Sequence, residues 1–163
     1  MVMMDKLLEF GDAASAAVTT AAVSLVLPNQ IDTLLTVPDL GNGEPVWFVC
    51  SVATAIVAAG AGTLEVQLVS DSSASIATDT SVTYHLRSPL ITTANNSTSN
   101  PAGKVLFAAP LPLTAATGAT LGLGGERFLG ARLVPLGNNI SSGAVDCYLT
   151  TDPAKYRAYA NAI

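Results

Sequence analysis

The side chains that could perform catalysis are few in this chain, and they are scattered along it. His85 is the single histidine, so a Ser-His-Asp triad or an imidazole general base would have to use it. It lies in an alternating stretch, on the polar face and close to Arg87, which indicates a solvated side chain. The sequence therefore predicts no enzyme active site.

Cys50 and Cys147 are the two cysteines of the chain. A zinc site needs three or four His, Cys or acidic ligands, so these two residues and His85 could form one only if the fold happened to bring them together. Two buried thiols that behave as small apolar side chains are the favoured interpretation. A single bridge between them is the alternative, and it requires that their strands face each other.

Two glycine-rich segments, 41–43 and 122–125, invite comparison with a phosphate-binding loop. A Walker loop leads into a helix and ends in Lys followed by Ser or Thr, whereas both segments lead into strand patterns and lack that ending. Both are interpreted as turns. Asp71, Asp79 and Asp152 lie in predicted loops and could bind calcium only weakly, because the ligand ladder of an EF-hand is missing. We therefore expect no cofactor and no metal site.

The overall composition favours a protein that is packed against other proteins. Of the 163 residues, 50% are hydrophobic and 12% are charged, which is about half the usual share of charged residues. The net charge is −5 and the seven Lys and Arg residues are scattered, so we expect no binding to nucleic acid. The apolar run at 13–27 is too short and too polar to span a membrane, and the start of the chain makes a poor signal peptide.

Alternation of apolar and polar residues, the period of a half-buried strand, is the dominant pattern. In the segment 81–87 we expect Val82, Tyr84 and Leu86 to point inward. The segment 46–56 is apolar on both faces, as a central strand would be. The segments with strand-like patterns are 18–27, 46–56, 63–68, 81–87, 104–108, 127–136 and 144–150.

Turn-forming Gly, Pro and Asn residues separate these segments, and many short strands joined in this way indicate a sandwich or a barrel. We therefore predict a single all-β domain, an antiparallel β-sandwich, at 18–152. An N-terminal extension at 1–17 and a C-terminal tail at 153–163 flank it. The tail could hold one helical turn after Pro153.

Charged and aromatic residues near the ends of the predicted sandwich yield two further expectations. Arg127 lies in an apolar stretch and should reach a carboxylate or backbone carbonyls, because an unpaired buried charge is strongly unfavourable. Tyr and Arg past the last strand are typical of interfaces, although the tail could instead pack back over the sandwich. The candidate interface residues are Leu7, Leu8, Phe10, Tyr156, Arg157 and Tyr159.

Five segments of the chain resemble, in order, the phage capsid cement family whose type member is a Bordetella phage cement protein. They are DKLLEFGDA at 5–13, DLGNGEPVWF at 39–48, GTLEVQL at 62–68, ERFLGARL at 126–133 and the closing strand at 144–153. The second and fourth segments are the more specific ones. The polar segment 94–103 departs from the family pattern.

This resemblance implies a jelly-roll sandwich that binds the outer surface of a capsid of HK97-fold subunits and stabilises it. It also implies a homo-oligomer, with a dimer favoured over a trimer, that is made in the cytoplasm of a bacterial host and ends up on the virion. The expected partners are the major capsid protein and further copies of the chain, and the family has no catalytic residues. The competing expectation is a receptor- or carbohydrate-binding jelly roll of a phage particle. Such a site needs exposed aromatic side chains near amides, and the loop at 92–100 has amides but no aromatic residue.

Overall fold

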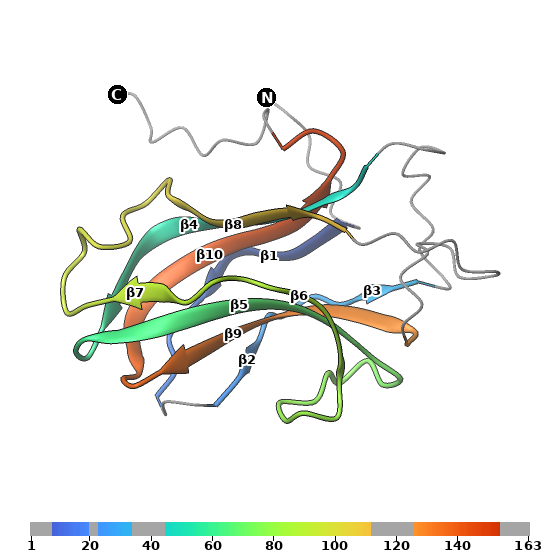
Figure 1. Ribbon diagram of the computed structural model, residues 1–163, viewed down its shortest axis with the longest axis horizontal. Coiled ribbons are helices and arrows are strands. Elements are labelled where there is room, and N and C mark those ends of the chain that lie inside the picture. Colours follow the sequence, from blue (N-terminus) through green and yellow to red (C-terminus); the bar gives the residue numbers. More distant parts are fainter. Residues whose placement is uncertain (1–7, 20–22, 34–44, 112–125, 154–163) are drawn as a thin grey trace.

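The computed structural model describes residues 8–19, 23–33, 45–111 and 126–153, which form an all-β domain (Figure 1). Because apolar side chains alternate with polar ones along most segments, each strand can bury one face and expose or cover the other. The strands in these ranges are β1 Glu9–Ser15, β2 Leu25–Val26, β3 Ile31–Asp32, β4 Trp47–Ala58, β5 Gly62–Asp71, β6 Thr83–Arg87, β7 Ile91–Thr93, β8 Val105–Pro110, β9 Phe128–Leu136 and β10 Ile140–Thr150.

Two antiparallel sheets pack face to face and form the upper and lower layers of Figure 1. The smaller sheet has the order β1-β10-β4-β8, and the larger one has the order β2-β9-β5-β6. In the larger sheet, β3 also pairs with β9, and β7 also pairs with β5. The predicted central strand at 46–56 is β4, which lies between β10 and β8 as expected.

The strand pairs are nested in the manner of a jelly roll. β1 pairs with β10, β2 and β3 with β9, β4 with β8, and β5 with β6 and β7. Successive pairs alternate between the two sheets, so the chain wraps around the core as one long folded hairpin. The predicted antiparallel sandwich in a single domain is confirmed, and its strand order is that of a jelly roll.

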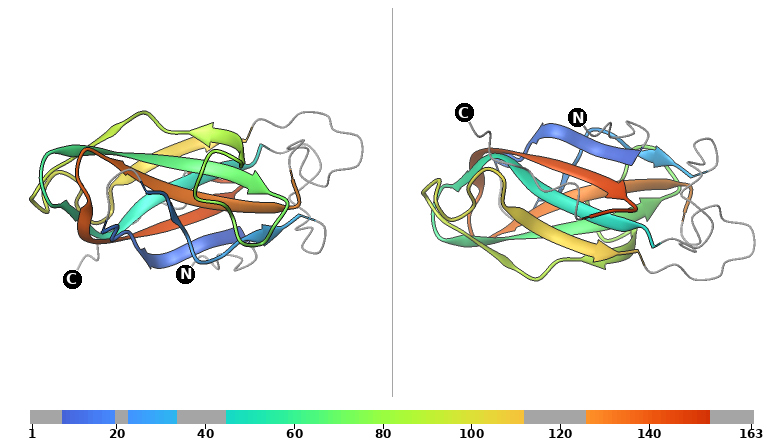
Figure 2. Two further views of the ribbon diagram at one scale, coloured as in Figure 1. Left: turned by 90° about the horizontal axis from the view of Figure 1, so that it is seen from below. Right: turned by 90° about the horizontal axis from the view of Figure 1, so that it is seen from above.

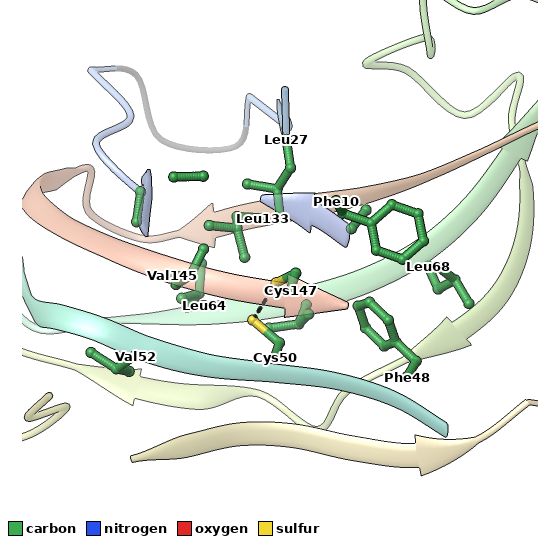
Figure 3. Packing of buried hydrophobic residues seen from close by; sticks show 14 of the residues in the cluster. Phe10, Leu27, Phe48, Cys50, Val52, Leu64, Leu68, Leu133, Val145 and Cys147 are labelled. Carbon is green, nitrogen blue, oxygen red and sulfur yellow. Dashed lines mark hydrogen bonds between the residues drawn. The ribbon is translucent and has the colours of Figure 1, made fainter. Parts of the chain in front are cut away.

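The core fills the space between the sheets (Figure 3). Phe10 of β1 stacks edge-on against Phe48 of β4, with ring centroids 5.8 Å apart. Phe48 in turn contacts Phe107 of β8 in the same geometry at 6.1 Å. From the larger sheet, Leu64 and Leu133 close the core from the opposite side.

The sandwich begins earlier in the sequence than the predicted boundary at residue 18. β1, which the prediction places in an N-terminal extension, is hydrogen-bonded along β10, and Phe10 is fully buried. Most of the predicted strand at 18–27 is not regular in the described residues: Val18 forms an isolated bridge with Ile140, and only Leu25–Val26 pairs as a strand. The helical turn expected after Pro153 falls outside the described residues.

The predicted orientation of β6 is wrong at Tyr84. Leu86 packs against the core and Val82 is buried, but the Tyr84 side chain is exposed. The register explains the difference, because Leu86 pairs with Leu68 while Tyr84 pairs with Val69, which leaves His85 as an extra residue in a bulge. A bulge shifts the inward and outward alternation of a strand by one residue.

Candidate functional site

A buried polar network lies on the face of the larger sheet that points away from the core. Arg132 of β9 is only 1% exposed. Its Nε and Nη2 donate to Oε1 of Gln67, at 3.2 and 2.8 Å. Its Nη1 donates to the backbone carbonyls of Ala77 and Asp79, both at 2.8 Å, and Nη2 also reaches the hydroxyl of Tyr84 at 3.1 Å. The Arg132 side chain therefore connects its own strand β9 with β5, with β6 and with the loop that carries Ala77 and Asp79.

Glu65 extends this network toward the edge of the sheet. Gln67 Nε2 donates to Glu65 Oε2 at 3.1 Å, and Arg87 Nε and Nη2 donate to the two carboxylate oxygens at 2.6 and 3.0 Å. The hydrogen bonds from Arg87 lower the pKa of Glu65, although burial opposes them. Each charged side chain of the network therefore has hydrogen-bonding partners within the fold, which favours a rigid structural role.

The loop at 72–82 is held over the outer face of the sheet by this network. Asp71 accepts the N–H groups of Ser73 at 3.0 Å and of Ala77 at 2.8 Å, and these backbone hydrogen bonds lower the pKa of Asp71. Ile76 packs on Val69. Gly130 leaves room for the Ile76 side chain, because a Cβ at Gly130 would lie 2.8 Å from Ile76 Cγ1. Among the described residues, no group of three His, Cys, Asp or Glu side chains is placed to hold a metal ion.

His85 is half-buried and is not the solvated side chain that the sequence predicts. Its Nε2 lies 2.8 Å from Ser70 Oγ, and Ser70 also accepts the N–H of Glu126 at 3.1 Å. Burial lowers the pKa of His85. Because Ser70 is buried, its hydroxyl is not placed to attack a substrate, and the pair is better suited to joining β5, β6 and the segment just before β9.

Cys50 of β4 and Cys147 of β10 are free thiols that face each other inside the core (Figure 3). Their sulfur atoms are 2.7 Å apart. Both interpretations of the sequence therefore hold in part: the thiols are buried in apolar surroundings, and their strands face each other.

Arg127 is paired as expected. Its Nε and Nη2 form a forked contact with the carboxylate of Asp32 in β3, the shortest bond being 2.7 Å. The guanidinium also lies 4.9 Å from the ring centroid of Phe128. This ion pair is much more exposed than the Arg132 network, so it anchors the short strand β3 near the surface of the sandwich.

The polar loop at 94–103 uses two of its three amide side chains, those of Asn96 and Asn100, internally. Asn96 Oδ1 accepts hydrogen bonds from the backbone N–H and hydroxyl groups of Thr98 and Ser99. Asn100 is fully buried, donates to the carbonyl of Thr92 and accepts from Lys104 Nζ at 2.7 Å. The loop is therefore a self-bonded connection between β7 and β8.

One side of the sandwich carries exposed apolar side chains next to uncovered strand edges. β8 is an edge of the smaller sheet, and β6 and β7 form an edge of the larger one; Figure 2 shows that these edges lie along the same side. Leu90 is 59% exposed and Val105 is 42% exposed, beside four half-buried apolar residues that reach the core. We call this surface the β6–β8 side and define it by Leu86, Leu90, Ile91, Val105, Leu106 and Phe107.

The predicted interface residues have mixed outcomes. Phe10 is a core residue with no exposed surface, so its assignment to an interface is wrong, because the bulged strand β1 turns its ring inward. Leu8 is half-buried and packs against the same core. Leu7 stays a prediction outside the described residues, as do the three tail residues Tyr156, Arg157 and Tyr159.

Within the described residues, no helix has the length and the hydropathy that a membrane crossing requires. No curated protein matches the chain. The family model named Bbp16 matches residues 12–148, which cover most of the sandwich from β1 to β10. This protein is thus a jelly-roll member of the Bbp16 family, whose name points to a Bordetella phage protein.

Proposed function

We propose that this protein is a capsid cement protein, which binds the outer surface of a phage capsid of HK97-fold subunits and stabilises it. The observation that carries the proposal is the Bbp16 family match over residues 12–148. The resemblance of five segments, from 5–13 to 144–153, to a phage cement family supports the finer assignment to a cement role. The role is structural, and we infer that the protein has no enzymatic activity.

A cement protein acts as a multivalent clamp. Each copy contacts more than one capsid subunit, so weak individual contacts add through their high effective concentration. If the protein binds the expanded shell and not its ruptured form, binding stabilises the shell by mass action. A homo-oligomer, a dimer in preference to a trimer, would multiply the contacts, and its place is the outside of the virion.

We infer that the β6–β8 side contacts the major capsid protein. Leu90 and Val105 are the most exposed large apolar side chains of this side, and β8 has an edge with no strand partner among the described residues. An uncovered apolar strand edge invites association, so it is usually protected in a protein that acts alone. Arg87 and Lys104, which are adjacent in sequence to Leu86 and Val105 of this side, already have partners in their own chain.

A receptor- or carbohydrate-binding role is the alternative function. It would need amides that are free to bind a sugar. In the loop at 94–103, Asn96 accepts four internal hydrogen bonds and Asn100 is buried. Because two of the three amide side chains of the loop are engaged within it and the loop has no aromatic residue, the cement role is the better supported of the two.

The contact surface can be tested by co-sedimentation with bare expanded capsids of the parent phage. We expect the double variant L90E/V105E to bind at least tenfold more weakly than the parent protein while it keeps the same melting temperature. Val23→Glu is the matched control, because Val23 is 46% exposed and precedes β2 at the opposite edge of the larger sheet. Equal loss of binding in both variants would reject this side as the contact. A changed oligomeric state of L90E/V105E with normal capsid binding would assign it to a second copy of the chain.

A further inference from the structure

The two central strands of the smaller sheet hold a pair of thiols in direct contact. Cys50 and Cys147 are partners in the register of β4 and β10. Cys147 Sγ donates a weak hydrogen bond to Cys50 Sγ over 2.7 Å, and neither residue has any exposed surface. Figure 3 shows the two side chains pointing toward each other between the sheets.

This placement meets the geometric requirements of a disulfide. A disulfide spans Cα atoms about 4.4 to 6.8 Å apart, and directly opposed residues of an antiparallel pair are about 4.5 or 5.5 Å apart. The S–S bond is about 2.05 Å long, so the sulfur atoms have to approach by well under an ångström. No change of strand register is needed.

We propose that Cys50 and Cys147 form a latent disulfide that stays reduced in a reducing cytoplasm and closes in an oxidising environment, where it staples β4 to β10. The bond would link residues 97 positions apart and so constrain the unfolded chain strongly. The move from cytoplasm to exterior rests on the proposed function, since a virion leaves the cell that made it. The chemistry of the thiol pair does not depend on that function.

The reaction is a thiol–disulfide exchange with a low-molecular-weight disulfide such as oxidised glutathione. One cysteine thiolate attacks the oxidant, forms a mixed disulfide and releases one glutathione thiolate. The second cysteine thiolate then attacks the mixed disulfide at the protein sulfur and releases the other glutathione thiolate. The protein is oxidised by two electrons, one oxidant disulfide becomes two thiols, and the two cysteine protons end on them.

Burial determines when this reaction can occur. The absence of exposed surface excludes the oxidant from the folded core, and burial raises the pKa of the Cys147 thiol well above its usual range. Only the thiolate is reactive, so the folded protein should oxidise slowly, through openings of the β4–β10 pair. Refolding in the presence of the oxidant should form the bond readily, and the closed bond should then resist reductants unless the protein unfolds.

The test is to refold the full chain with oxidised or with reduced glutathione and to compare the two samples. We expect the oxidised sample to lose both titratable thiols, to lose about 2 Da in mass, and to melt on the order of 10 °C higher. Tryptic digestion of the unaltered protein without reductant should yield the peptide 7–87 joined to the peptide 133–155. Cys147→Ala is the control, and its melting temperature should be the same in both samples.

Two results would overturn the inference. The first is two free thiols after oxidative refolding, or cross-links that join only separate molecules. The second is an internal disulfide that leaves the melting temperature unchanged or lowers it. Capsid binding is a separate measurement, so a protein that forms the bond but does not bind capsids would reject the cement role and leave the staple intact.

Discussion

Replacing Arg132 by methionine should detach the loop at 72–82 from the larger sheet. The guanidinium makes five hydrogen bonds, to Gln67, Ala77, Asp79 and Tyr84. Methionine fills a similar volume but donates to none of these acceptors. Gln67 Oε1 is buried and would lose both of its Arg132 donors, which costs about 1–3 kcal/mol, whereas the loop carbonyls can turn to water.

The expected total is a loss of about 3 kcal/mol in the free energy of unfolding. The lost charge-assisted hydrogen bonds and the unsatisfied Gln67 oxygen both destabilise the variant. The variant no longer has to bury a charge, and this gain offsets part of the loss. Urea denaturation measures this loss, and hydrogen exchange of the peptide 72–82 should show a less protected Ala77 amide. Arg127→Met is the matched control, since it removes the same charge from a more exposed pair with Asp32 and should cost far less. Equal effects of the two variants on stability, with unchanged exchange in the loop, would refute the structural role of the network.

Three further changes probe the rest of the sandwich. Phe10→Ala should destabilise the free protein by about 3–5 kcal/mol in urea denaturation, as expected for a core ring and not for an interface residue; a loss under 1 kcal/mol would contradict its place in the core. Gly143→Ala should lower stability by about 1–3 kcal/mol, because φ is +133° and a Cβ would lie 2.8 Å from the Ile56 Cα; Gly60→Ala, which meets only a side chain, is the control and should cost less. His85 has a lowered pKa in the folded state, so its stabilising effect is complete above the unfolded value of about 6.5 and is lost as the pH falls below it. Between pH 7.5 and 5.5 the parent protein should therefore lose more stability than His85→Gln, and parallel curves would reject this reasoning.

The strands that were predictable from the sequence are those with an undisturbed alternation of apolar and polar residues. β5 illustrates this, since Leu64, Val66 and Leu68 all face the core. β1 was not recognised, because bulges shift its register twice and Ala13 has a positive φ of 46°, which hides the period of two. Isolated sequence patterns carry no record of such bulges.

The polar network could be anticipated only in part. An arginine inside the apolar stretch 127–136 signals a charge that needs partners, which both Arg127 and Arg132 have, but only Arg132 is buried. Its partners, however, come from β5 and from a loop more than 50 residues away in the sequence. Only the fold brings them together, as it does for the two cysteines and for the apolar residues of the β6–β8 side.

The central claim is tested most directly by heating bare expanded capsids of the parent phage with and without the purified protein. The account predicts that saturating protein sediments with the capsids and raises their rupture temperature. Because binding is multivalent, variants that break the homo-oligomer should lose this protection more steeply than one lost contact would explain. Equal rupture temperatures with and without the protein, and no protein in the sedimented capsid fraction, would contradict the cement role.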